Sequence, residues 1–145
     1  SHFDDEQLGL PLLLDINKRL HVPNQYSRLA ALVCEHHTKQ HRILELRPAT
    51  LLKLIEALDG FRRPERVQKF LLACEADARG RTGLEQRDYP QSAYLKTVLN
   101  ELSQLDVGSL LKEAKPENPQ EFVSQSRLKL LGDIVARLNP SASTN

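Results

Sequence analysis

The fold is decided by one stretch of the chain, FRRPERVQKFLLACEADARGRTG at residues 61–83. Pro64 suits the first turn of a helix, where its missing N–H would have had no partner. From there the apolar side chains recur every three or four residues, which is the spacing of one face of an α-helix. We therefore expect a helix from Pro64 to about Ala78, followed by a turn that carries arginines and glycines. Its inward face consists of Val67, Phe70, Leu71 and Cys74, and it ends in Asp77.

Helical spacing and helix-starting prolines recur along the rest of the chain, and no segment alternates like a convincing strand. Gly60 follows the third apolar run and is placed like a helix C-cap. The sequence therefore predicts an all-α array of about five to seven helices. The expected helices are residues 6–20, 23–39, 48–58, 64–78, 90–105 and 119–138.

We divide the chain into three parts on this basis. Residues 1–105 form the main helical unit, and residues 106–138 are a helical extension packed on it. The polar tail at 139–145 is expected to be mobile, as chain ends without apolar anchors usually are. The chain starts with Ser and contains no Met, so we expect a piece of a longer protein, truncated at its N-terminus.

Composition narrows the class of function. The 145 residues are 40% hydrophobic and 27% charged, which is typical of a folded globular domain. The net charge is +1, so contact with nucleic acid would need a local basic patch. Aromatics make up 5% and Trp is absent, which argues against an aromatic stacking platform. No apolar run approaches a membrane span of about 20 residues. With no secretory signal visible, we expect a cytoplasmic protein with reduced cysteines and no membrane partner.

Two polar side chains stand on otherwise apolar helical faces. His37 lies near the end of the second expected helix, and Asp77 lies near the end of the fourth. If these ends meet, the pair suits a divalent metal such as nickel, manganese or zinc, or a buried hydrogen-bonded couple. The alternatives are a satisfied core histidine and a carboxylate bonded to Arg79 or Arg81.

A histidine cluster, EHHTKQH at residues 35–41, offers a second arrangement for metal binding. His37 and His41 are four residues apart and can share a helical face, which is a spacing that chelates metal. The glutamate that H-E-x-x-H sites place between the histidines is missing. Surface histidines at a fraying helix end are the alternative.

Arginines gather on both sides of the stretch quoted first. Their forked guanidinium groups match phosphate oxygens in pairs. Gly80 and Gly83 let a backbone approach a ligand closely. A salt-bridged turn is the alternative. The arginines that we select as RNA-binding candidates are Arg62, Arg63, Arg66, Arg79 and Arg81.

Two segments resemble a known family. HVPNQYSRLAALVCEHH at 21–37 and ALDGFRRPERVQKFLLACEADARGRTGLEQRDYP at 57–90 are similar to the C-terminal region of bacterial CCA-adding enzymes. These tRNA nucleotidyltransferases are also called multifunctional CCA proteins. The resemblance runs from about residue 2 to residue 99, and EADARGRTG followed by DYPQ is its most specific part. It implies an HD-type helical fold.

The resemblance also implies partners and chemistry. The parent protein would add C, C and A to tRNA 3′ ends, with Mg²⁺, CTP and ATP bound by a catalytic head that this chain lacks. The chain itself would then hold no residue that catalyses nucleotide addition, and would be inactive alone. Alternatives are a metal-dependent phosphohydrolase that acts on 2′,3′-cyclic phosphates, and a helical module for tRNA binding or homodimerisation.

The metal ligands of the HD pattern are carried over residue by residue. His37 and Asp77 match a histidine and an aspartate of the family, and His2 aligns with the first histidine of an H-x-x-H-E segment. A metal in this set would be nickel or manganese. Asp5 replaces the second histidine, and the defining His-Asp dyad is not in this chain. The resemblance therefore implies a partial or degenerate hydrolase site.

Overall fold

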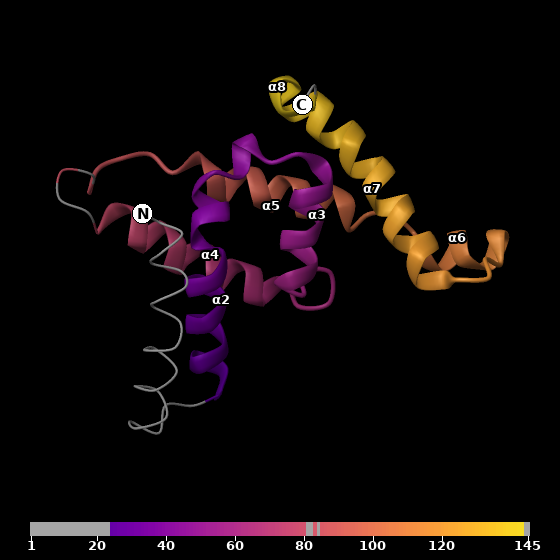
Figure 1. The fold of residues 1–145 in the computed structure, drawn as a ribbon, viewed down its shortest axis with the longest axis horizontal. Helices are drawn as coiled ribbons and strands as arrows, with labels where there is room; N and C mark the ends of the chain where they lie inside the picture. Colours follow the sequence, from indigo (N-terminus) through magenta and orange to yellow (C-terminus); the bar gives the residue numbers. More distant parts are fainter. Residues whose placement is uncertain (1–23, 81–82, 84, 144–145) are drawn as a thin grey trace.

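The computed structural model describes residues 24–80, 83 and 85–143, and within those ranges it contains helices and no strand (Figure 1). This confirms the prediction of an all-α array. The helix expected at residues 6–20 lies outside the described ranges. The elements are α2 (Asn24–His41), η1 (Ile43–Glu45), α3 (Pro48–Ala57), α4 (Pro64–Arg79), α5 (Pro90–Leu102), α6 (Val107–Ala114), α7 (Pro119–Leu138) and α8 (Pro140–Ser143).

Four helices start where the prolines predicted. Proline occupies the first turn of α3, α4, α5 and α7, where a missing N–H leaves no helical hydrogen bond unmade. The start of α7 is also capped, because the Asn118 side chain accepts a hydrogen bond from the Glu121 N–H. These start positions are therefore set locally, by the backbone chemistry of each first turn.

The core lies where α3, α4, α5 and the second half of α7 come together. Helix α2 packs against α4, while α3 and α5 pack against α7. In Figure 1, α7 leads away from this body, and α6 lies at its far end. The apolar face predicted for α4 is confirmed as core. The most buried side chains of the cluster include Phe70, Leu71, Cys74, Leu95, Val98 and Leu131.

The turn after α3 differs from the expectation of a glycine cap. Asp59 takes the left-handed conformation, with φ of 55°, while Gly60 does not. Gly60 is needed for packing instead. A Cβ added there would lie 3.1 Å from Ile55 Cγ2 and 3.2 Å from Val67 Cγ2. The glycine lets the turn close tightly onto the start of α4.

The C-terminal part contains two short helices, α6 and α8, that are not among the helices expected from the sequence. Helix α6 is capped by Asp106, whose side chain accepts from the Ser109 N–H at 3.0 Å. Within the tail expected to be mobile, residues 140–143 form α8, where Ala142 is 4% exposed. The Asn139 amide donates to the Leu44 carbonyl at 2.6 Å, which anchors the tail to η1. In the described part of the chain, every helix is too short or too polar to cross a lipid bilayer.

Candidate functional site

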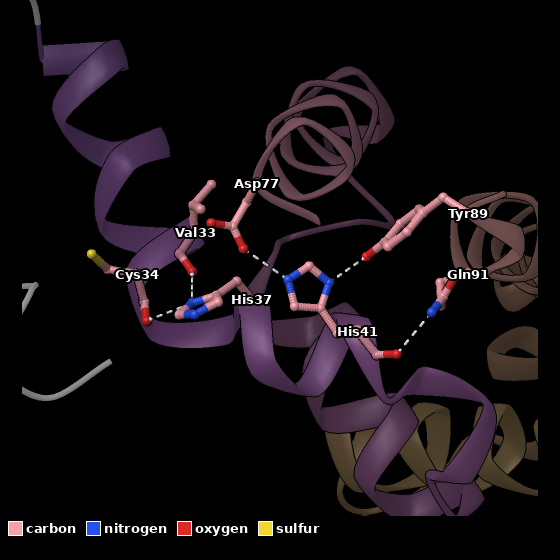
Figure 2. A network of polar contacts seen from close by, with 7 residues as sticks. All are labelled: Val33, Cys34, His37, His41, Asp77, Tyr89 and Gln91. Carbon is pink, nitrogen blue, oxygen red and sulfur yellow. Dashed lines mark hydrogen bonds and ion pairs between the residues drawn. The ribbon is translucent and has the colours of Figure 1, made fainter. Parts of the chain in front are cut away.

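The C-terminal ends of α2 and α4 meet through one imidazole (Figure 2). His41 lies in the last turn of α2, and its Nε2 is 2.9 Å from Asp77 Oδ2 at the end of α4. Its Nδ1 is 2.9 Å from the Tyr89 hydroxyl, just before α5. Both ring nitrogens therefore have a partner, and the His41 side chain links three segments that are distant in sequence.

Backbone contacts complete this cluster. The Gln91 amide donates to the His41 carbonyl at 3.0 Å, and the Gln40 amide donates to the Gln91 carbonyl at 3.3 Å. We call His41, Asp77, Tyr89 and Gln91 the polar junction. A neutral His41 with its proton on Nε2 donates to Asp77 and accepts the Tyr89 O–H. An imidazolium donates at both nitrogens, so the geometry suits either protonation state of the ring.

Burial keeps the Tyr89 phenol and the Cys74 thiol in their protonated forms. It raises the pKa of Tyr89 above its ordinary value of 10.0, and the nearby Cys74 adds to the effect. Burial, reinforced by the Asp77 carboxylate, raises the pKa of the Cys74 thiol to about 12. Neither group is a ready nucleophile at neutral pH, because nucleophilic attack needs the thiolate or phenolate. The contacts of His41 link the ends of α2 and α4 to the segment just before α5.

The predicted pair of His37 and Asp77 is arranged differently. The structure brings Asp77 to His41, one turn further along α2 than His37. His37 Nδ1 lies 2.9 Å from the Val33 carbonyl, on its own helix. The two imidazole rings stand edge to face, with centroids 5.7 Å apart. The expected helix stopped at Lys39, which hid the role of His41.

A metal ion does not fit the described residues by themselves. Among residues 24–80, 83 and 85–143, no three His, Cys, Asp or Glu side chains converge as a metal site would require. The third candidate ligand, His2, lies outside these ranges. Asp77 is also 43% exposed, in contrast to the apolar pocket expected for it.

The five candidate arginines have different surroundings. Arg79 is held internally, because its guanidinium lies 2.8 Å from Glu75 and its Nε donates to the Arg87 carbonyl. The ion pair lies within α4, and the hydrogen bond to Arg87 spans the segment that follows the helix. Arg62 and Arg63 both reach toward Asp59, at 3.8 Å and 3.6 Å. Arg81 lies outside the described residues.

A groove of about 480 Å³ runs between the start of α2 and the first turns of α4. Among the described residues, its lining includes the cations Arg28, Arg63, Arg66 and Lys69 and the carboxylate of Glu65. We call this the basic groove. Within the described part of the chain, Arg28, Arg66 and Lys69 form no ion pair. The sequence reasoning missed Arg28, because it lies 35 residues before Arg63 and joins the group only in the fold. Tyr26, Leu29 and Leu72 complete the lining.

Comparison with known proteins identifies relatives that share one printed name. The chain is 50% identical over 115 residues, 79% of its length, to the multifunctional CCA protein of Teredinibacter turnerae. It is 46% identical over 141 residues, 97% of its length, to that of Ectopseudomonas mendocina. The same protein of Hahella chejuensis is 42% identical over 98% of the chain.

The matched region is a minor part of each relative. The chain spans 28%, 34% and 31% of the lengths of these three proteins. No protein-family model matches the chain, and no solved structure matches it.

Proposed function

This chain belongs to the multifunctional CCA protein family, to whose C-terminal region it corresponds, and on that premise we propose that the whole protein adds CCA to tRNA 3′ ends. CTP, ATP and Mg²⁺ would be bound by parts of the protein outside this chain. The observation that carries the proposal is the 46% identity that extends over 97% of the chain.

Within that protein, the chain serves as a helical body that contacts tRNA. Two features support this role. The polar junction ties α2, α4 and α5 together without offering a reactive nucleophile. The candidate arginines at the start of α4 lie on the surface, with Arg62 76% exposed and Arg63 47% exposed. Guanidinium groups in such positions contact phosphates without reading sequence.

Binding of tRNA to the purified chain tests this role. Phosphate contacts release counterions, so affinity should fall steeply as salt rises. The paired substitution Arg63→Ala with Arg66→Ala should weaken binding and flatten the salt dependence. Lys53→Ala with Lys129→Ala is the matched control, because it removes the same charge from exposed positions on other helices. Affinity that is unchanged in the arginine variant, or independent of salt, contradicts the proposed tRNA contact.

A second candidate is a metal-dependent phosphohydrolase in the parent protein. The contact between His41 and Asp77, beside the ring of His37, favours it. His37, Asp77 and His2 would be ligands of nickel or manganese, completed by residues outside this chain. Calorimetric titration of each metal into the wild type, His37→Ala and Asp77→Asn tests this idea. Saturable binding lost in both variants supports a metal pocket. Equal heats in all three contradict it.

A homodimer of the helical body is the remaining alternative. Sedimentation at several protein concentrations distinguishes a monomer from a homodimer. A mass of 16.5 kDa at every concentration corresponds to the monomer.

A further inference from the structure

We propose that the basic groove binds an unpaired segment of RNA, with its phosphates on Arg28, Arg66 and Lys69 and one base stacked on Tyr26. The inference rests on the proposed tRNA contact and gives it a location and a ligand class. Tyr26 and Arg28 were not among the RNA-binding candidates selected from the sequence.

The first argument is electrostatic. Among the described residues, four cations and one carboxylate line the groove, so its lining carries an excess of positive charge. Arg63 is partly balanced by Asp59 at 3.6 Å. The other three cations have no ion pair among the described residues. Gathering like charges costs free energy, and a bound polyanion removes that cost.

The second argument concerns the ligand's shape. A groove of about 480 Å³ is within the usual range for small-molecule sites, and it suits one or two nucleotides better than a flat patch would. A duplex presents its phosphates on a wide convex surface. A single strand can instead turn a base into the groove while its backbone follows the rim.

The third argument is the aromatic ring at the rim. Tyr26 is 57% exposed, whereas Tyr94 is 8% exposed in the core. On the opposite side, Leu72 is 66% exposed. The ring of Tyr26 and the side chain of Leu72 match the apolar base of a nucleotide, and the neighbouring cations match its charged phosphate. Stacking of this kind contributes roughly 1–3 kcal/mol per base.

The groove is also separate from the polar junction. It is lined by the first turns of α2 and the first half of α4, whereas the junction uses the last turn of each helix. Substitutions in the groove can therefore be made without touching His41, Asp77 or Tyr89. This separation makes the inference testable by mutation.

The test uses the 145-residue chain with fluorescein-labelled oligouridine, an RNA duplex of equal length and full tRNA, with anisotropy as the readout. Tyr26→Ala should weaken oligouridine binding about five-fold or more, the effect of losing one stacked base. Tyr26→Phe should restore it, because the ring stacks without its hydroxyl. Arg28→Ala with Lys69→Ala should weaken binding and reduce the salt slope, whereas Lys53→Ala with Lys129→Ala should not. Circular dichroism checks that every variant is folded.

The outcomes separate this inference from the proposed function. One outcome is that the Arg63 and Arg66 variant binds tRNA more weakly, while Tyr26→Ala and the Arg28 and Lys69 variant bind tRNA as the wild type does. The proposed tRNA contact then stands, and the groove inference is overturned. Equal weakening of duplex and oligouridine by Tyr26→Ala also overturns the stacked base. If the chain binds no RNA of any kind, the proposed tRNA contact and the groove inference both fail.

Discussion

The two ends of the α2–α4 pair teach opposite lessons about polar side chains. At the polar junction, each nitrogen of His41 has a partner, and three segments converge on it. In the basic groove, three of the four cations have no carboxylate partner in the described residues. A paired polar cluster stabilises a fold, whereas an unpaired one is available to a ligand. The difference suggests that α2 and α4 are fixed at one end so that they can present charge at the other.

The largest expected effect comes from the anchor that both regions share. Phe70 is 0% exposed and holds α4 in the core. Phe70→Ala should lower the free energy of unfolding by about 3–5 kcal/mol, through lost burial and the cavity left behind. Urea denaturation followed by circular dichroism measures it. Leu72→Ala, on the same helix but 66% exposed, is the control and should be nearly neutral. Equal losses in the two variants would mean that α4 is not packed as described.

The next largest effect tests whether the junction is a structural tie. His41→Ala should cost about 1–3 kcal/mol, because it removes two hydrogen bonds, and Asp77→Ala should cost less, because its carboxylate is 43% exposed. Their double variant should cost less than the sum, since the two side chains contact each other. The same urea titrations give the coupling. Strictly additive losses would show that the 2.9 Å contact does not contribute to stability.

A smaller effect is expected at Tyr89 and should depend on pH. Tyr89→Phe removes one hydrogen bond to His41, for a loss of about 0.5–1.5 kcal/mol. Because burial raises the pKa of Tyr89 in the folded state, the unfolded phenol ionises first. The free energy of unfolding should therefore fall as pH rises through about 10, and less steeply in Tyr89→Phe. Parallel pH profiles for the two proteins would contradict the burial of this phenol.

The smallest expected effect belongs to the basic groove. Arg28→Ala, Arg66→Ala and Lys69→Ala should each change stability by no more than about 0.5 kcal/mol, because none of these side chains forms an ion pair with another described residue. At low salt, each substitution should raise the free energy of unfolding slightly, because removing one cation reduces the repulsion among the others. Thermal unfolding at two salt concentrations measures both. A loss of more than about 1 kcal/mol in any variant would mean that these cations hold the fold.

Much of the fold could be predicted because its signals are local. Pro48, Pro64, Pro90 and Pro119 mark helix starts, and apolar spacing marks the buried faces. Helix α6 was missed for a local reason too, since it is 8 residues long and none of its side chains is buried. Its signal was Asp106 three residues before Ser109, an N-cap pattern.

The site was harder to predict because its contacts are distant in sequence. His41 and Asp77 are 36 residues apart, and His41 and Tyr89 are 48 apart. Spacing could place His37 and His41 on one helix, but not decide which of them α4 would meet. Likewise, the groove becomes basic only when Arg28 of α2 comes beside α4. Pairings of this kind depend on how helices pack, which a period of 3.6 residues does not encode.

The most direct test of the contrast between the two ends is a cross-link. RNA that carries 4-thiouridine would be irradiated with the chain, and the attached peptides identified by mass spectrometry. We expect attachment at Tyr26 and at the first turns of α4, and none at Tyr89 of the polar junction. Attachment concentrated on Tyr89 and its neighbours, with Tyr26 unmodified, would contradict the assignment of one end to structure and the other to RNA.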